Sequence, residues 1–333
     1  MGTRIHPDAV LFPEGGQLPA LPAVDHYAGN EKLMRKALAL QQETATQGMA
    51  TIDLSFDCED GAAVGREREH IAMAAALVMS EDNRFGRVGI RIHDITHPAW
   101  LSDLQHAVAA AGSRLAFITQ PKARHADDVR RVLRALREAE RDAGLQRQIP
   151  LHVLIETTGA LHQVWEIAAL PGVESLDFGL MDFVSAHQGA IAGSAMQSPG
   201  QFEHAILRRA KTEIAAAALA HRVVPTHNVC TELRDVQKIH ADARRAREEF
   251  GFLRMWSIHP NQIGPILEAM QPDFSELVEA HEVISAAQDA LWGPIQMDGR
   301  LHDRASYRYY WNLLKRAQAT GAKMPEQASE RFF

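Results

Sequence analysis

The order of short apolar runs and longer amphipathic runs limits the folds open to this chain of 333 residues. Eight short runs are rich in β-branched or apolar residues: Ala9–Phe12, Thr51–Phe56, Val88–Ile92, Leu115–Thr119, Leu151–Ile155, Val173–Phe178, Arg222–Val224 and Arg254–Ile258. Longer runs with a helical pattern follow them: Glu31–Gln47, Arg66–Met79, Pro98–Ala111, Ala126–Ala143, Gly159–Ala169, Gln201–His221, Thr231–Phe250 and Asn261–Met270. Strands that alternate with helices form parallel sheets, and eight strands are the number that closes a barrel. The sequence therefore predicts an α/β fold of the (β/α)8 TIM-barrel type.

An open, doubly wound sheet is the alternative arrangement for the same alternation. That fold usually carries a glycine-rich turn after its first strand. The turn after the first predicted strand is Pro13-Glu14-Gly15-Gly16, which lacks the spacing of a dinucleotide-binding turn. The sequence therefore favours the closed barrel.

The alternation of strands and helices stops after Met270. Phe274–Leu291 is predicted to be one more helix, and a short helical tail is predicted over Ala305–Ala319. We therefore expect a catalytic barrel domain over residues 1–270 and a C-terminal helical extension over residues 271–333. The extension is expected to form an arm or lid that packs on a neighbouring subunit.

Composition excludes several classes of protein. The net charge of −7 and the pI near 6.2 argue against nucleic-acid binding, which needs a concentrated basic surface. No apolar run approaches the ~20 residues that span a bilayer, and residues 1–7 lack the apolar core of a secretory signal. Cys58 and Cys230 are too few for a disulfide framework or a structural zinc cluster. We expect a cytoplasmic protein with neither a nucleic acid nor a membrane as partner.

Polar residues gather where the predicted strands end, and in TIM-barrel enzymes the chemistry takes place at the carboxyl ends of the strands. The residues at these positions are Asp57, Glu59, Asp60, Arg91, His93, Gln120, Lys122, Glu156, Thr157, Asp182, Thr226, His227, Asn228 and His259. Strand interiors of such barrels are normally rich in Val, Ile and Leu. The sequence therefore predicts a polar active site on one face of the barrel.

Glu156 and Asp182 follow neighbouring strands and suit a hard divalent cation. Mg²⁺ typically takes one or two protein carboxylates and keeps sites open for substrate oxygens, and Mn²⁺ fits the same residues. The alternative is that both acids cap short helices. Arg91 lies in an apolar strand, where a guanidinium group needs a carboxylate from the substrate or from the protein, such as Glu59 or Asp60.

Two further residues have both a functional and a structural interpretation. Lys122 could place a positive charge on a thioester or a carboxylate, or it could be a solvated loop lysine. His259 could contact the substrate or be a hydrogen-bonded structural histidine, and the same choice holds for His93 and His227.

Six motifs in this order resemble the citrate lyase β-subunit-like (CitE-like) group of the HpcH/HpaI aldolase superfamily, which includes malyl-CoA and citramalyl-CoA lyases. They are Asp57-Cys58-Glu59-Asp60, Val88-Gly89-Ile90-Arg91-Ile92-His93, Gln120-Pro121-Lys122, Leu154-Ile155-Glu156-Thr157, Phe178-Gly179-Leu180-Met181-Asp182, and Gly251-Phe252 through Ile258-His259-Pro260-Asn261-Gln262-Ile263. Together they span about residues 50 to 270.

The resemblance implies a (β/α)8 barrel that assembles as a trimer or hexamer. It places Glu156 and Asp182 at the family's Mg²⁺ ligands, and Arg91 at the arginine that holds the substrate. Glu59 and Asp60 match the acidic pair around that arginine. Asp298-Gly299-Arg300-Leu301-His302-Asp303 is similar to a segment whose aspartate reaches a neighbouring subunit's active site, so Asp303 is the matching residue. His93 stands where the family usually has Asn, and the N-terminal segment lacks the family's usual basic residue.

The resemblance implies a Mg²⁺-dependent carbon–carbon lyase acting on a malyl-, citramalyl- or citryl-type β-hydroxyacyl thioester, with release of a keto acid and an acetyl-type thioester. Arg91, Lys122 and His259 are the candidate substrate-binding residues, and Asp303 or the pair Glu59 and Asp60 would move the proton. Two alternatives remain. One is a class II aldolase that uses pyruvate or another free keto acid, so that the small-molecule partner is an organic acid rather than its CoA thioester. The other is a non-catalytic protein that binds organic acids.

Overall fold

The computed structural model describes residues 5–13, 16–46 and 48–333. The chain forms two compact units, one of Pro22–Met270 and the other of Met1–Leu21 together with Gln271–Phe333. Two predictions touch residues outside the described part. They are the turn Pro13-Glu14-Gly15-Gly16, at Glu14 and Gly15, and the end of the helix Glu31–Gln47, at Gln47.

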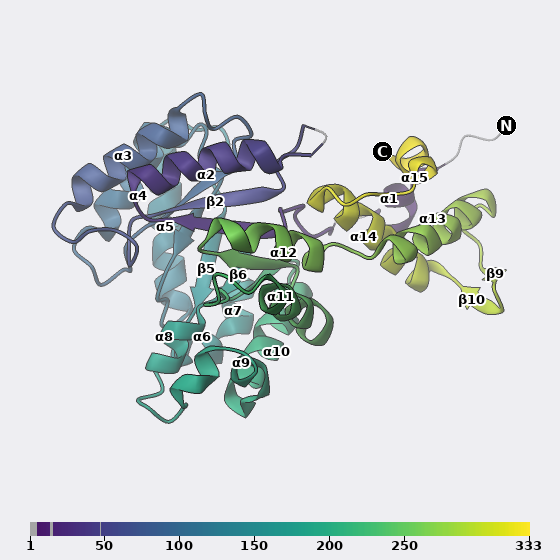
Figure 1. The fold of residues 1–333 in the computed structure, drawn as a ribbon. Coiled ribbons are helices and arrows are strands. Elements are labelled where there is room, and N and C mark those ends of the chain that lie inside the picture. Colours follow the sequence, from purple (N-terminus) through teal and green to yellow (C-terminus); the bar gives the residue numbers. More distant parts are fainter. Residues whose placement is uncertain (1–4, 14–15, 47) are drawn as a thin grey trace. The chain divides into compact units, whose positions relative to one another are not determined.

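The larger unit is a closed barrel of eight parallel strands in sequence order, which confirms the predicted fold (Figure 1). The strands are β1 (Val24–Ala28), β2 (Ile52–Asp57), β3 (Val88–Arg91), β4 (Ile118–Gln120), β5 (Leu151–Ile155), β6 (Val173–Phe178), β7 (Val224–His227) and β8 (Arg254–Ser257). Every neighbouring pair is parallel, and β8 pairs with β1 to close the barrel. The carboxyl ends of all eight strands therefore lie at one end of this unit.

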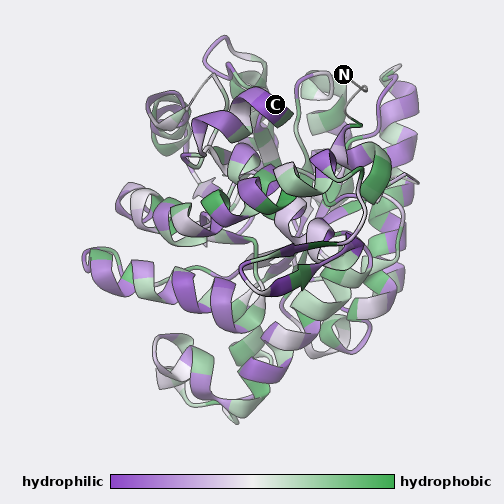
Figure 2. Ribbon diagram, turned by 90° about the vertical axis from the view of Figure 1, so that its right-hand side faces the viewer, coloured by the Kyte–Doolittle hydropathy of each residue, from purple (hydrophilic) through white to green (hydrophobic). Residues whose placement is uncertain are grey.

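Helices follow the strands of this unit. They are α2 (Glu31–Thr44), α3 (Glu67–Met79), α4 (Trp100–Ala111), α5 (Ala126–Asp142), α6 (Thr158–His162), α7 (Val164–Ala168), α8 (Leu180–Ser185), the 3₁₀ helix η1 (Gly193–Met196), α9 (Gly200–Glu203), α10 (Ala205–Ala220), α11 (Val236–Phe250) and α12 (Pro260–Met270). Hydrophilic and hydrophobic residues alternate along many of the helices, as amphipathic packing requires (Figure 2). The predicted helices 159–169 and 201–221 are each interrupted, at Gln163 and at the extended residue His204.

The first predicted strand is wrong, because Ala9–Phe12 belongs to a helix and its end. Pro7 begins α1 (Pro7–Leu11), and the side chain of His6 accepts a hydrogen bond from the N–H of Asp8. Proline favours the first turn of a helix, where its missing N–H costs nothing. The first barrel strand is instead Val24–Ala28, whose polar Asp25 and His26 are both buried.

The interior of the barrel is polar at both ends and apolar between them. Side chains alternate across each strand, so residues two apart on a strand lie on the same face. Arg254 on β8 donates to Asp53 on β2 at 2.7 Å, past the intervening strand β1, so both side chains face inward. Further along the strands, Tyr27, Leu154 and Trp256 form a separate hydrophobic cluster, packed with Val229. We call the residues Tyr27, Leu154 and Trp256 the apolar layer.

Inward-facing side chains recur every two residues along a strand, and the apolar layer lies between two sets of charged ones. Each of its members lies two residues beyond a polar one on the same strand: Asp25 before Tyr27, His152 before Leu154 and Arg254 before Trp256. Two residues beyond Leu154 is Glu156, at the carboxyl end of β5. The barrel therefore has a charged lower end, an apolar middle and a charged upper end where the strands terminate.

The smaller unit is built around its own hydrophobic cluster. It contains α1, α13 (Phe274–Asp289), the antiparallel strands β9 (Ile295–Met297) and β10 (Arg300–His302), α14 (Arg304–Thr320) and α15 (Glu326–Phe332). Leu11 of α1 belongs to the same cluster as Leu277 and Trp311, and the indole N–H of Trp311 donates to Asp8 at 2.6 Å. Helix α1 therefore packs with the C-terminal helices of this unit.

In the part of the chain that the structure describes, no helix is both long enough and apolar enough to cross a membrane.

Candidate active site

Arg91 ends β3 inside the barrel and is held by two carboxylates. Its Nε and Nη2 donate to the two oxygens of Asp57 at 2.8 and 2.6 Å, and its Nη1 lies 3.2 Å from Glu59 Oε2. Burial alone would raise the pKa of Asp57, but Arg91 and the N–H groups of Glu59 and Gly61 lower it. The bidentate pair is therefore ionised, and it fixes the plane of the guanidinium group.

Lys122 connects the acidic pair to the end of β5. The side-chain Nζ of Lys122 lies 2.6 Å from Glu59 Oε1 and 2.9 Å from Asp60 Oδ1. The backbone N–H of Lys122 donates to Glu156 Oε1 at 2.5 Å. Burial raises the pKa of Glu59, although Arg91 and Lys122 oppose the shift. Lys122 has a φ of +48°, a backbone conformation uncommon for residues other than glycine. Lys122 therefore contacts three carboxylates while its own backbone is strained, and strained residues of this kind cluster at functional sites.

Glu156 is a buried acid at this end of the barrel, and its pKa is strongly raised. Burial raises its pKa to about 8, and the neighbouring charge of Asp182 adds to the shift. Gly179, which ends the turn between β6 and α8, leaves room for this carboxylate, because a Cβ at that position would lie 2.3 Å from Glu156 Oε2. Asp182 lies in the first turn of α8, and no described residue donates a hydrogen bond to its carboxylate. The two carboxylates are thus close enough to repel, and neither forms an ion pair with a cationic side chain of the described residues.

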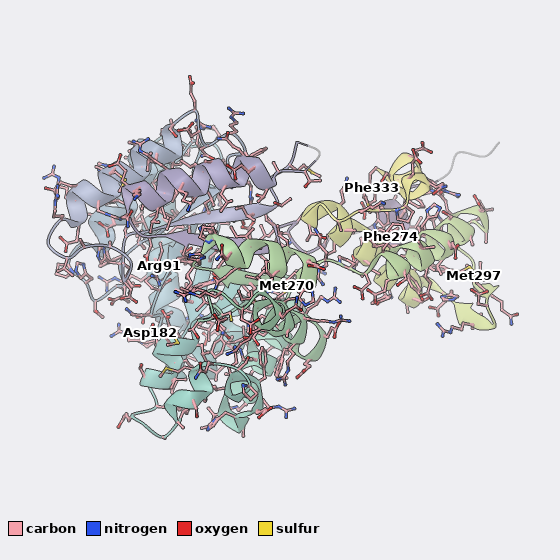
Figure 3. All side chains as sticks on the ribbon, viewed as in Figure 1. Arg91, Asp182, Met270, Phe274, Met297 and Phe333 are labelled. Carbon is pink, nitrogen blue, oxygen red and sulfur yellow. The ribbon has the colours of Figure 1, made fainter. Side chains whose placement is uncertain are left out.

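Arg91 and Asp182 both belong to the barrel unit, where Figure 3 labels them. The five sequence-predicted residues Glu59, Asp60, Arg91, Lys122 and Glu156 form one connected set of ion pairs and hydrogen bonds. Asp182 joins them through its electrostatic coupling to Glu156. The structure thus brings together six of the predicted site residues, which lie at or shortly after the carboxyl ends of β2, β3, β4, β5 and β6.

His259 and Asp303, which the sequence analysis also placed at the site, make local contacts. The ring of His259 accepts a hydrogen bond from the N–H of Asn261 at 3.2 Å, at the start of α12. Asp303 belongs to the smaller unit, where it caps α14 by accepting from the N–H groups of Ala305 and Ser306. Both remain predicted site residues, His259 from its position after the eighth strand and Asp303 from the resemblance.

Two other histidines have structural partners. His93 pairs with Asp103 at 2.5 Å and stacks on His97. His227 is buried beside Lys211, with 2.5 Å between Nε2 and Nζ. Neither makes a hydrogen bond to the set around Arg91 and Glu156 within the described residues.

Two contacts of Arg91 were not predicted from the sequence: the aromatic ring beneath it and its bidentate ion pair with Asp57. The guanidinium carbon of Arg91 lies 5.3 Å from the centre of the Tyr27 ring, and Tyr27 in turn packs on Trp256 with 4.3 Å between ring centres. Tyr27 belongs to the strand that was not predicted. Asp57, rather than Glu59 or Asp60 alone, holds Arg91. The signal for Asp57 was its place as the last residue of a strand next to the strand of Arg91.

The fold and the site define a TIM-barrel protein with two adjacent acids and a fixed arginine at the carboxyl ends of the strands. The model of the HpcH/HpaI aldolase/citrate lyase family matches residues 39–260, and the chain therefore belongs to this family. The resemblance drawn from the sequence motifs is confirmed, and so is the class of enzyme, a carbon–carbon lyase.

Three known proteins of related name or fold are similar to this chain. A citrate lyase from Burkholderia xenovorans LB400 is 52% identical, with a TM-score of 0.86 over 98% of this chain and 100% of that one. An L-malyl-CoA/β-methylmalyl-CoA lyase from Cereibacter sphaeroides is 27% identical over 85% of this chain and 92% of its own length. The protein CitE from Mycobacterium tuberculosis, in complex with magnesium, acetoacetate and coenzyme A, shares the fold at 21% identity and a TM-score of 0.65, covering 90% of this chain and 99% of that one.

Proposed function

We propose that this protein is a Mg²⁺-dependent lyase that cleaves a malyl-, citramalyl- or citryl-type β-hydroxyacyl-CoA thioester into a keto acid and an acetyl-type thioester. The observation that carries the proposal is the pair Glu156 and Asp182, two acids at the mouth of the barrel that no cation from the described part of the chain pairs with directly. The malyl-CoA lyase from Cereibacter sphaeroides supports the thioester class, and the citrate lyase from Burkholderia xenovorans supports the citryl-type variant.

The residues at this pair fit a hard divalent cation. Burial raises the pKa of Glu156 to about 8, which reflects a carboxylate whose charge the surroundings do not balance. Oxygen ligands are those that Mg²⁺ prefers, and Mn²⁺ would accept the same set. When bound, the cation would act as a Lewis acid that stabilises the changing charge on the substrate oxygens.

Arg91 is suited to hold a substrate oxygen in a fixed position. A guanidinium group has five N–H donors. Asp57 accepts two of them, and Glu59 lies next to a third, so one N–H on each terminal nitrogen remains. Because its partners are fixed by strands β2 and β3, Arg91 can disperse developing negative charge without first reorganising. Lys122 adds a second positive charge 2.6 Å from Glu59.

Glu59 is one candidate for moving the proton between the substrate hydroxyl and the enolate. Burial raises its pKa, which favours a carboxyl group that can take up a proton during turnover. Asp303 is the other candidate, and we propose that it acts in the site of a neighbouring subunit of a trimer or hexamer. As the N-cap of α14, it is exposed in the single chain.

Mixed oligomers test whether Asp303 works between subunits. Asn caps helices as well as Asp does, so Asp303→Asn should lower activity without changing the melting temperature. Co-expressed Asp303→Asn and Glu156→Gln chains, purified through two different tags, should regain activity because some sites then contain one intact residue of each kind. Mixed oligomers no more active than the sum of the two parent variants would contradict the arrangement. Light scattering should show a mass above that of one chain.

Mg²⁺ binding is expected to weaken as the pH falls below about 8, the raised pKa of Glu156. Below that pH the metal-free carboxyl group holds a proton that must leave before a cation binds. The apparent affinity should therefore fall about tenfold for each pH unit. Calorimetric titration with Mg²⁺ across this range measures the slope, and an affinity independent of pH would contradict it. Asp182→Asn should lower the affinity at every pH without removing the slope.

A chromatographic assay of carbon–carbon cleavage tests the proposed function. Malyl-CoA, citramalyl-CoA and citryl-CoA are each incubated with the protein, with Mg²⁺ and with a chelator, and Asp182→Asn serves as the control. Metal-dependent release of acetyl-CoA and a keto acid is the expected result. No release from any thioester would reject the thioester reaction. Turnover of pyruvate with an aldehyde panel would then identify a class II aldolase, and binding of keto acids without turnover would identify a non-catalytic protein.

A further inference from the structure

Three buried side chains meet at the lower end of the barrel, away from the candidate active site. Asp25 of β1, His152 of β5 and Asp177 of β6 each offer one atom suited to binding a metal, and these three atoms lie within 4.8 Å of one another. All three side chains are fully buried. Ligand atoms with bonds of about 2.1 Å to a tetrahedral cation lie about 3.4 Å apart, so each pair of these atoms would have to approach by no more than about 1.4 Å to bind one ion.

Each of these three side chains carries a buried polar atom that has no hydrogen-bond partner among the described residues. These atoms are Asp25 Oδ2, Asp177 Oδ2 and His152 Nδ1. The nearest cation to Asp25 Oδ2 is Arg254, whose Nη2 lies 3.9 Å away and instead donates to Asp53 at 2.7 Å. Buried polar atoms are nearly always paired, because an unpaired one costs about 1–3 kcal/mol. Three unpaired buried atoms, on side chains that approach one another this closely, therefore indicate a missing bound group.

The opposite side of each of these three side chains is held in place. Ser55 donates to Asp25 Oδ1 at 2.9 Å, and Ser175 donates to Asp177 Oδ1 at 2.5 Å. His152 Nε2 lies 3.0 Å from a carboxylate oxygen of Glu174, and its ring stacks on Phe117 with 3.9 Å between ring centres. A histidine that binds a metal typically donates its other N–H to a carboxylate, which fixes the ring and its tautomer. His152 has this arrangement, with Nδ1 left for the ion.

The charged groups around these three side chains carry an excess of two negative charges, which one divalent cation would neutralise. Four carboxylates lie in the connected set, on Asp25, Asp53, Glu174 and Asp177, against the two guanidinium groups of Arg87 and Arg254. Two negative charges therefore remain uncompensated, and the carboxylates of Asp25, Asp53 and Asp177 are fully buried, whereas Glu174 and Arg87 are partly exposed. Isolated charges of this kind are costly in a protein interior unless they are paired or coordinate a metal. A doubly charged cation would balance the set.

The site is distinct from Glu156 and Asp182. The apolar layer lies between the two, since Leu154 separates His152 from Glu156 along β5. Its ligands also differ in kind: one imidazole nitrogen with two carboxylate oxygens suits first-row transition metals such as Zn²⁺, whereas Mg²⁺ and Ca²⁺ prefer oxygen alone.

We propose that Asp25, His152 and Asp177 bind a first-row divalent transition-metal ion, with Zn²⁺ as the best match, that joins strands β1, β5 and β6 across the inside of the barrel. An ion in this place would stabilise the fold rather than touch the substrate.

Metal analysis of the intact protein tests this site separately from the upper one. The double variant Glu156→Gln/Asp182→Asn is expressed in medium supplemented with Zn²⁺, or with Co²⁺ as a spectroscopic probe, and is dialysed against a chelator in the native state. Because the lower site is fully buried, we expect one equivalent of Zn²⁺ per chain to remain. The Co²⁺ protein should show visible absorption from nitrogen and oxygen coordination.

Two variants place the ion at the lower site. Asp177→Asn keeps the size of the side chain but should lose the retained metal in the double-variant background. Glu174→Gln removes the carboxylate behind His152 and should weaken metal affinity about 10- to 100-fold. If Asp177→Asn does not fold, metal retention by the double variant and the Glu174→Gln shift still decide the question. No metal in the double variant, or full retention by Asp177→Asn, would overturn the proposal and leave shared protons as the balancing charge.

Discussion

Replacing Glu156 by glutamine should abolish Mg²⁺-dependent cleavage while the fold remains intact. The change removes one carboxylate of the pair with Asp182 at nearly constant size. Metal polarisation of a substrate oxygen supplies several kcal/mol of transition-state stabilisation, so kcat/KM in saturating Mg²⁺ should fall about 1,000-fold or more. Full activity of the variant would show that the cation is held elsewhere.

The same variant should gain stability in alkaline, metal-free buffer. Burial raises the pKa of Glu156 to about 8 in the folded chain from 4.5. A raised carboxyl pKa contributes stability at low pH that is lost as the pH rises through the folded value. Glutamine does not ionise, so above about pH 8 the variant should melt at a higher temperature than the wild type. Glu138→Gln, at an exposed position of α5, is the matched control and should change neither activity nor stability.

Replacing Arg91 by methionine should destabilise the protein by about 3–5 kcal/mol, the usual cost of removing one partner of a buried ion pair. The side chains of Arg91 and Asp57 are 9% and 6% exposed, so the remaining carboxylates of Asp57 and Glu59 would be left in the barrel without their cation. The unfolding free energy in urea measures the loss. Activity should also fall, because the two remaining N–H donors are removed together with the charge.

Two further variants separate the lost charge pair from lost packing. Asp57→Asn added to Arg91→Met should restore part of the stability, because one of the unpaired charges disappears. Arg130→Met removes an exposed arginine paired with Asp127 and Glu166 and should cost no more than about 1 kcal/mol. Equal losses of unfolding free energy on replacing Arg91 and Arg130 would mean that the buried Arg91–Asp57 pair stabilises the fold no more than an exposed pair does.

The barrel was predictable because its repeating pattern does not depend on any one strand. Seven of the eight predicted strands overlap barrel strands, and their apolar runs match positions buried on both faces of the sheet. The first strand was missed because Val24–Ala28 carries Asp25 and His26, which a pattern of apolar residues does not detect. Their burial depends on partners from the two strands that flank β1 in the sheet, Ser55 on β2 and Ser257 on β8. Only the closed barrel brings those partners together.

The proximity of several candidate site residues could be predicted from the sequence, but their individual contacts could not. The position of Glu59, Arg91, Lys122 and Glu156 at strand ends follows from the (β/α)8 pattern, and the structure connects all four. The choice of Asp57 as the bidentate partner of Arg91 depends on the register of β2 with β3, which places these two residues opposite each other. Register is a property of the assembled sheet. Tyr27, which supports Arg91 from below, lies on the strand that the sequence pattern did not reveal.

The apolar layer of Tyr27, Leu154 and Trp256 gives the barrel two compartments that can change independently. Mutations at the upper rim can alter which acid or thioester is accepted without disturbing the charges that hold the lower strands together. Mutations in the lower compartment can tune thermal tolerance without reaching the chemistry. A library directed at new substrates should therefore leave these three positions fixed and vary the loops above them, so that the search for specificity and the maintenance of the scaffold remain separate tasks.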